Sequence, residues 1–206
     1  NERYASLEAK REIIKKKKLN TKFVTVTSCD ADHVYYPKHF SCLAFKFLSD
    51  SHRYNKFWQP AVFFYQNIWE LPPITRIVNR ISSMWNLAQL PRTDRLINAQ
   101  NYSLSFKLLD YSGYWDPDVV PEDYNLFYKA FYKSQGKIDV EPLYLPLMAD
   151  APVGNSTLDT FKNQYFQYQR WAWGVSDDPA VIKKYFLVWD VPFWNKTVRL
   201  IHLFKE

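Results

Sequence analysis

The chain has 206 residues, which is enough for a single domain with a substantial core. Its formal charge of +6, from 27 Lys and Arg against 21 Asp and Glu, suits phosphate ligands, anionic lipid and nucleic acid equally and selects none of them. Four glycines without a G-x-G-x-x-G or P-loop pattern exclude a glycine-rich phosphate loop, and two cysteines exclude a disulfide framework.

Hydrophobic periodicity predicts strands and helices that alternate along most of the chain. A polar loop is expected over 49–56, and no run of about 18 apolar residues predicts a membrane span. The pattern as a whole indicates an α/β fold with a helical tail. Strands are expected over 22–28, 57–66 and 138–147, helices over 2–18, 37–48, 72–90, 103–111, 122–134 and 158–173, and one or two amphipathic helices over 181–204.

Two carboxylates one residue apart, Asp30 and Asp32, follow the first predicted strand. Open α/β sheets bind ligands where their strands end. Such a D-x-D pair can face one Mg²⁺ or Mn²⁺ ion, which prefers oxygen ligands and keeps substrate phosphates in its other positions. A helix-capping or solvated pair remains the alternative. His33 can approach the same ion or be an ordinary hydrogen-bonded histidine.

A second acidic pair, Glu122 and Asp123, opens the helix predicted over 122–134. Acidic residues are common in a first helical turn because the helix dipole favours them there. A carboxylate at this position can also act as a general base that removes the proton of an acceptor hydroxyl. The residues alone leave both interpretations open.

The helix predicted over 158–173 carries a Q-x-x-R-W sequence. Gln167, Arg170 and Trp171 stand three and four residues apart, which places them on one helix face. Together they can grip phosphate oxygens and stack on a sugar ring. Packing of Trp171 in the core is the alternative.

The order of these motifs, D-x-D then E-D then Q-x-x-R-W, resembles that of membrane-bound family-two glycosyltransferases such as cellulose, chitin and hyaluronan synthases. The resemblance covers about Phe23 to Gly174. It implies that residues 1–180 form the C-terminal part of a GT-A (Rossmann-like) nucleotide-sugar transferase domain, whose first strands would lie upstream of Asn1. It also implies inverting transfer of a hexose from a nucleotide-sugar, expected to be a UDP-sugar, to an acceptor hydroxyl in polysaccharide or glycolipid synthesis.

The resemblance also implies a role for each motif residue. The D-x-D would bind Mg²⁺ or Mn²⁺ and the donor diphosphate, the E-D pair would supply the catalytic base, and the Q-x-x-R-W would close over the diphosphate and line the acceptor site. These roles fall on Asp30 and Asp32 as metal ligands, with Asp32 the closer, on Asp123 as base with its neighbour Glu122, and on Gln167, Arg170 and Trp171 as substrate-binding residues.

Two departures from the family pattern stand out. Pro121 precedes the E-D pair where the family often has threonine, so that contact is lost. The small-residue segment that usually comes before the base is not evident near 98–103. Contacts to the acceptor from this segment are therefore left unassigned.

The tail, residues 181–206, combines aromatic and basic residues such as Trp189, Trp194 and Arg199. This pattern favours an interfacial helix in the lipid headgroup layer, with packing on the domain as the alternative. Transmembrane helices are expected beyond it, as in the family, so the domain is expected on the cytoplasmic face of the membrane.

The expected partners are a nucleotide-sugar donor, a saccharide or lipid-linked acceptor and the membrane. No nucleic-acid partner is expected, because the aromatic and glycine signature of an RNA-binding sheet is missing. The alternative function is a non-catalytic GT-A-like module for binding or membrane assembly. The isolated chain is expected to be inactive, because half of the donor site would lie upstream.

Overall fold

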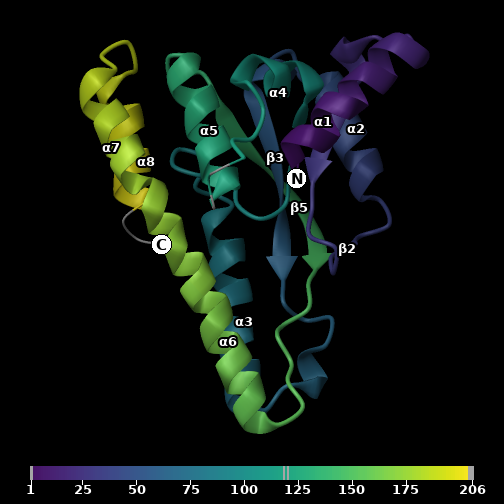
Figure 1. The fold of residues 1–206 in the computed structure, drawn as a ribbon, viewed down its shortest axis with the longest axis vertical. Coiled ribbons are helices and arrows are strands. Elements are labelled where there is room, and N and C mark those ends of the chain that lie inside the picture. The colour runs from purple at the N-terminus through teal and green to yellow at the C-terminus, as the bar shows by residue number, and fades with distance from the viewer. Residues whose placement is uncertain (1, 118, 120, 204–206) are drawn as a thin grey trace.

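The structure is a computed structural model that describes residues 2–117, 119 and 121–203 (Figure 1). These residues form an α/β fold around one mixed sheet in the order β1-β4-β3-β5-β2. Of the neighbouring strands, β3 and β5 are parallel and the other pairs are antiparallel. It follows that β1, β3 and β5 run in the same direction. Their C-terminal ends therefore point to the same side of the sheet, and this side is called the edge where β1, β3 and β5 end. The strands are β1 (Thr25–Ser28), β2 (Val34–Tyr35), β3 (Lys56–Phe63), β4 (Tyr102–Ser105) and β5 (Asp139–Met148).

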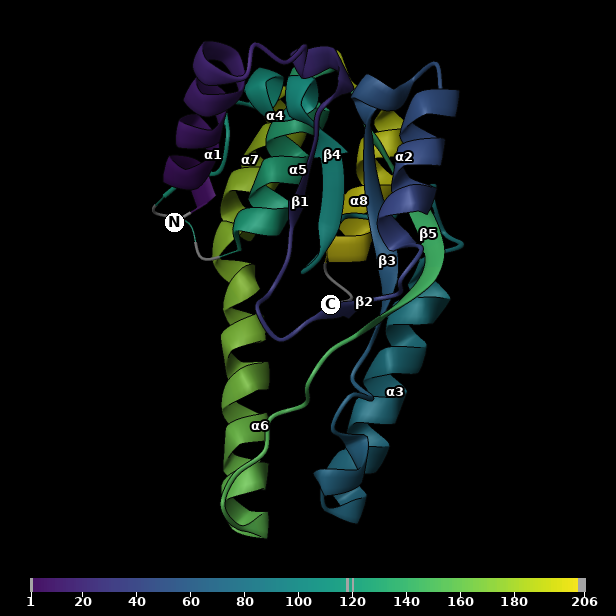
Figure 2. The same ribbon diagram turned by 90° about the vertical axis from the view of Figure 1, so that its right-hand side faces the viewer.

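Helices cover the sheet and extend beyond it. In Figures 1 and 2, α3 and α6 project past the ends of the strands. None of the helices in the described ranges is both long and apolar enough to cross a membrane. The helices are α1 (Glu2–Arg11), α2 (His39–Ser49), α3 (Pro73–Gln89), α4 (Phe106–Ser112), α5 (Glu122–Lys133), α6 (Thr157–Ala172), α7 (Asp178–Leu187) and α8 (Phe193–Leu203).

The prediction of a helix over 103–111 was wrong in its first part. Residues 102–105 form β4, a fully buried strand between β1 and β3. Ser103 pairs with Thr27 of β1, and their hydroxyls lie 2.8 Å apart. Ser105 then caps α4, because its hydroxyl accepts the N–H of Leu108 at 3.0 Å. The serines thus serve a strand and a cap, and periodicity cannot separate strand from helix in so short a run.

Other predicted elements are present with shifted ends. The first helix ends at Arg11 and continues as a π-helical turn over Glu12–Lys16. The first strand begins at Thr25, because a 3₁₀ turn occupies Thr21–Phe23. The two-residue strand β2 was not predicted. The tail forms two helices, α7 and α8, and Phe204 lies outside the described residues.

The core lies between the sheet and α5. Phe57 of β3 packs on Phe127 of α5 with ring centroids 5.9 Å apart, and Phe127 stacks on Phe131 at 5.7 Å. A second cluster, built around Val62, Phe64 and Leu147, closes the edge where β3 and β5 end. Aromatic residues, which are abundant in the sequence, therefore pack in both of these clusters.

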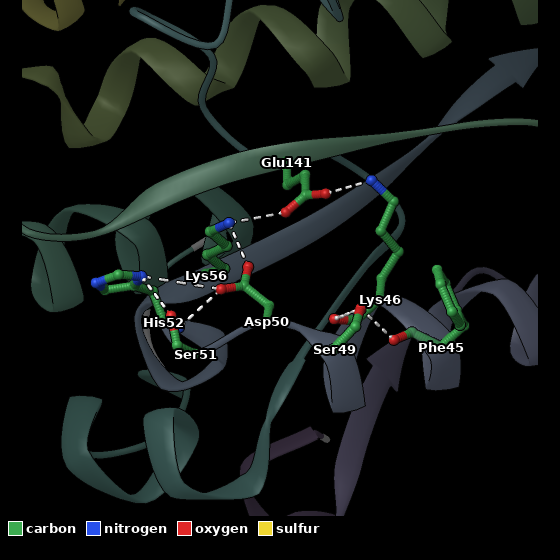
Figure 3. A network of polar contacts seen from close by, with 8 residues as sticks. All are labelled: Phe45, Lys46, Ser49, Asp50, Ser51, His52, Lys56 and Glu141. Carbon is green, nitrogen blue, oxygen red and sulfur yellow. Dashed lines mark hydrogen bonds and ion pairs between the residues drawn. The ribbon is translucent and has the colours of Figure 1, made fainter.

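At the opposite edge, ion pairs fasten α2 to the first residues of β3 and β5 (Figure 3). Lys56 pairs with Asp50 and with Glu141, the latter at 2.9 Å, and Lys46 reaches Glu141 at 2.5 Å. Burial alone would raise the pKa of Glu141. The hydrogen bonds from Lys46 and Lys56 outweigh burial and leave this pKa below its usual value.

Replacement of Glu141 by Gln should therefore destabilise the fold at neutral pH by about 1 kcal/mol, because two lysines lose their shared partner. A carboxylate with a lowered pKa stabilises the fold above its unfolded pKa, and this contribution is lost as pH falls through its folded pKa. Urea unfolding at several pH values measures the difference, which should shrink below about pH 4. The matched control is Glu12→Gln, whose exposed pair with Lys16 should contribute little. An equal loss in both variants would contradict the expectation.

Candidate active site

The D-x-D pair lies in the turn that follows β1, at the edge where β1, β3 and β5 end. Asp30, Asp32 and His33 each bring one ligand atom into a group whose members all lie within 4.8 Å of one another. The His33 Nε2 atom is 3.9 Å from Asp30 Oδ2 and 3.8 Å from Asp32 Oδ1. Both carboxylates are exposed, whereas the His33 side chain is only 3% exposed. The turn thus presents two accessible oxygens above a buried imidazole.

The buried ring of His33 is hydrogen-bonded to Asn101, a fully buried residue just before β4. The Asn101 amide nitrogen contacts His33 Nδ1, and its oxygen accepts a hydrogen bond from the Tyr35 hydroxyl at 3.4 Å. When Nδ1 accepts, the neutral imidazole carries its proton on Nε2, toward the carboxylates. A cation on Nε2 requires the other tautomer, with the Asn101 amide turned so that its oxygen accepts from Nδ1.

Asp123 lies at the start of α5, and its side chain accepts a hydrogen bond from the Gln100 N–H at 2.7 Å. The Asn98 amide binds the Asp123 carbonyl at 3.2 Å. Burial raises the pKa of Asp123 well above its usual value, and the charge of Glu122 raises it further. The hydrogen bond from Gln100 opposes this shift without reversing it.

The D-x-D and E-D motifs are linked through residues 100 and 101, which contact Asp123 and His33 respectively. The negative charges of Glu2 and Asp30 also raise the pKa of Asp123. The pKa of Glu2 is itself raised, mainly by burial and further by the charges of Glu122 and Asp30. Glu2 of α1 accepts a hydrogen bond from the Ser28 hydroxyl at the end of β1. The charges of Glu122, Glu2 and Asp30 therefore all act on the buried Asp123 carboxylate, an arrangement found in sites that bind cations.

Sequence reasoning missed Glu2 and the segment 98–101. Gln100 has a φ of 57°, a left-handed conformation that is uncommon outside glycine and is found at functional sites. Its N–H binds Asp123, and the next residue, Asn101, holds His33. This segment occupies the place where the family pattern has small residues. Its polar side chains were the available signal.

The Q-x-x-R-W motif lies on the last turns of α6. Trp171 packs on Phe64 with ring centroids 5.8 Å apart and is partly buried against the second core cluster. The Gln167 oxygen accepts a hydrogen bond from Gln164, and Arg170 is exposed. No contact between these three residues and the carboxylates is found in the described part of the chain.

The end of α6 nevertheless comes close to the start of α5. A Cβ atom built on Gly174 would lie 3.7 Å from the Tyr124 ring, and Tyr124 follows Asp123 directly. The packing of Trp171 on Phe64 is compatible both with a role in the core and with a role in sugar stacking, because Trp171 is only partly buried. Tyr35, which binds Asn101, packs against the same cluster. Gly174, three residues after the motif, therefore lies beside the helical turn that carries Asp123.

No protein-family model matches the chain, and no curated protein matches its sequence. The motif order and the geometry of the site are therefore the grounds on which a function is proposed.

Replacement of Asp123 by Asn should stabilise the metal-free protein. An acid whose folded pKa is raised destabilises the fold increasingly as pH rises from its unfolded pKa through its folded pKa. The gain should be about 1 kcal/mol or more at pH 8, which is about 2–4 °C for a chain of this size, and it should fade near pH 4.

The control is Asp110→Asn, since hydrogen bonds from Lys10 and Tyr114 lower the pKa of Asp110. The sign is opposite here, so this variant should lose stability at neutral pH and recover as pH falls. Thermal unfolding in EDTA across this pH range checks both variants. A loss of stability in Asp123→Asn at pH 8 would contradict the account of the buried carboxylate.

Proposed function

We propose that this chain carries the metal site and catalytic base of an inverting family-two glycosyltransferase, which transfers a hexose from a UDP-sugar to an acceptor hydroxyl. The observation that carries the proposal is that two adjacent residues link the two motifs, since the Gln100 N–H binds the Asp123 carboxylate and the Asn101 side chain contacts His33 beside Asp30 and Asp32. The linked motifs are the D-x-D and base motifs of the family that the chain resembles. Carboxylates gathered in this way destabilise a fold, so they favour a functional role.

Asp30, Asp32 and His33 would hold a Mg²⁺ or Mn²⁺ ion. Two carboxylate oxygens suit either ion, and one imidazole nitrogen is more typical of Mn²⁺. The gathering of the three ligand atoms within 4.8 Å of one another supports this assignment. When bound, the ion would neutralise charge that develops on the diphosphate leaving group.

Asp123 would act as the general base. Its raised pKa makes the carboxylate more basic than an ordinary aspartate, which brings it closer to the value that a base needs at neutral pH. The Gln100 N–H fixes the Oδ2 atom, so the other oxygen would accept the acceptor's proton. The acceptor oxygen then forms a bond to the anomeric carbon from the face opposite the departing UDP, which inverts the configuration.

The last turns of α6 would cover the leaving group. Arg170 is exposed and suited to pair with phosphate oxygens. Trp171 is anchored on Phe64, which supports a role as a rigid wall of the acceptor site. The proposed acceptor is a saccharide or lipid-linked hydroxyl, with the domain on the cytoplasmic face of a membrane.

Release of UDP and transfer of labelled sugar by the full-length protein, with a panel of UDP-sugars, test the proposal. Asp32→Asn and Asp123→Asn should each lower turnover by about 10²–10⁴-fold, since one removes a metal ligand and the other removes the base. EDTA should abolish transfer, and Mn²⁺ should restore it.

The matched control is Asp94→Asn, which removes a surface carboxylate paired with Arg92. This variant should keep full turnover. Undiminished transfer in EDTA would remove the metal from the mechanism, and full activity of Asp123→Asn would reassign Asp123 to a structural role.

A further inference from the structure

Helix α3 is amphipathic, and it packs on the protein through its polar face while its apolar face is exposed. Its inner face is polar, with Thr75, Asn79 and Ser83 each no more than 1% exposed. Asn79 donates a hydrogen bond to Gln164 of α6 at 2.7 Å, and the Ser83 hydroxyl accepts the N–H of Phe64 at 3.0 Å. The side of α3 that packs on the protein is therefore held by hydrogen bonds.

The opposite face of α3 is apolar and exposed. Its residues recur every three or four positions, which places them in one stripe along the helix. Their exposure runs from 51% for Trp85 to 66% for Met84. In a water-soluble domain the apolar stripe of a helix faces the core, so this orientation is the reverse of the usual one. The stripe consists of Ile74, Ile77, Ile81, Met84 and Trp85.

Basic and aromatic groups border the stripe. The guanidinium carbons of Arg76 and Arg80 lie 5.0 and 5.7 Å from the ring centroid of Trp69, an exposed residue just before the helix. The helix contains no acidic residue. Arginine and tryptophan beside an apolar stripe form the pattern of a helix at a membrane surface, where cations meet anionic headgroups.

The tail helix α8 also buries polar side chains and exposes apolar ones. Lys196 and Arg199 are buried, where Lys196 binds the carbonyls of Tyr185 and Val188 and Arg199 pairs with Asp139 at 3.0 Å. Trp194, by contrast, is 74% exposed, and Phe193 and Ile201 are also exposed. This helix packs on the domain through its basic side, so its aromatic side faces outward. Two separate helices thus present apolar faces to their surroundings.

We propose that the outer face of α3, together with Trp69, Arg76 and Arg80, is a lipid-binding surface that lies in the headgroup layer of a membrane with anionic lipid. The arginines favour lipid over a second copy of the chain, because a symmetric contact would bring like charges together. With 17 residues, or about 25 Å, α3 is shorter than a bilayer core, and its polar side is hydrogen-bonded to α6 and to Phe64, the residue that follows β3. The helix therefore lies along the surface. This proposal does not depend on sugar transfer.

Flotation of the chain with vesicles of equal parts phosphatidylcholine and phosphatidylglycerol tests it. The double variant I77E/I81E should bind at least about tenfold more weakly, since each isoleucine loses apolar burial and each new charge faces anionic lipid. The double variant I77L/I81L should bind like the wild type. The control is Phe45→Glu on α2, an exposed apolar position outside the stripe that should leave binding unchanged.

Two further measurements show whether anionic lipid or a second copy of the chain binds the outer face of α3. The double variant R76Q/R80Q should weaken binding to anionic vesicles several-fold and bring it close to the binding seen with phosphatidylcholine alone. Wild-type protein that fails to float, or I77E/I81E that floats normally, would overturn the proposal. Sedimentation that shows a dimer lost in I77E/I81E, without vesicle binding, would assign the face to a second copy instead.

Discussion

The hydrogen bond from the Gln100 N–H to the Asp123 carboxylate couples the two halves of the candidate site. It joins the start of α5 to the segment before β4, and the next residue along that segment, Asn101, holds His33 beside the D-x-D pair. The left-handed backbone at Gln100 is what lets adjacent residues face these two directions. A disturbance of this segment would therefore be felt both at the proposed base and at the proposed metal ligands.

The site is costly to the fold, and the surrounding core offsets that cost. Burial disfavours the charged form of Asp123 most, and the charges of Glu122, Glu2 and Asp30 add to this penalty. The aromatic stack of Phe57, Phe127 and Phe131 packs α5, which carries Asp123 in its first turn, against the sheet. A cation bound at the D-x-D pair would relieve the repulsion, so metal binding and stability are expected to be linked.

The sequence predicted the elements whose signals are local. Asp30 and Asp123 were placed correctly at a strand end and a helix start, because a β-branched run and a helical apolar spacing mark those boundaries. Their proximity could be expected only from the family resemblance. Glu2 and Asn101 were missed, because their roles depend on contacts between residues far apart in the chain.

Two failures have a common physical basis. Periodicity identifies a stripe on a helix without saying which side faces the core, so the outward stripe of α3 and the buried basic residues of α8 could not be predicted. Likewise, the serines of β4 suit a strand, a cap or a helix surface, and only their partners in β1 and α4 decide. In each case the outcome depends on what packs against the segment.

Anomalous diffraction at the manganese edge, from crystals of the chain grown with Mn²⁺, tests the central claim most directly. A single strong peak is expected about 2.1–2.3 Å from a carboxylate oxygen of Asp32, with Asp30 and His33 around it. A manganese peak elsewhere on the chain, or no peak at the turn after β1, would contradict the proposed metal site.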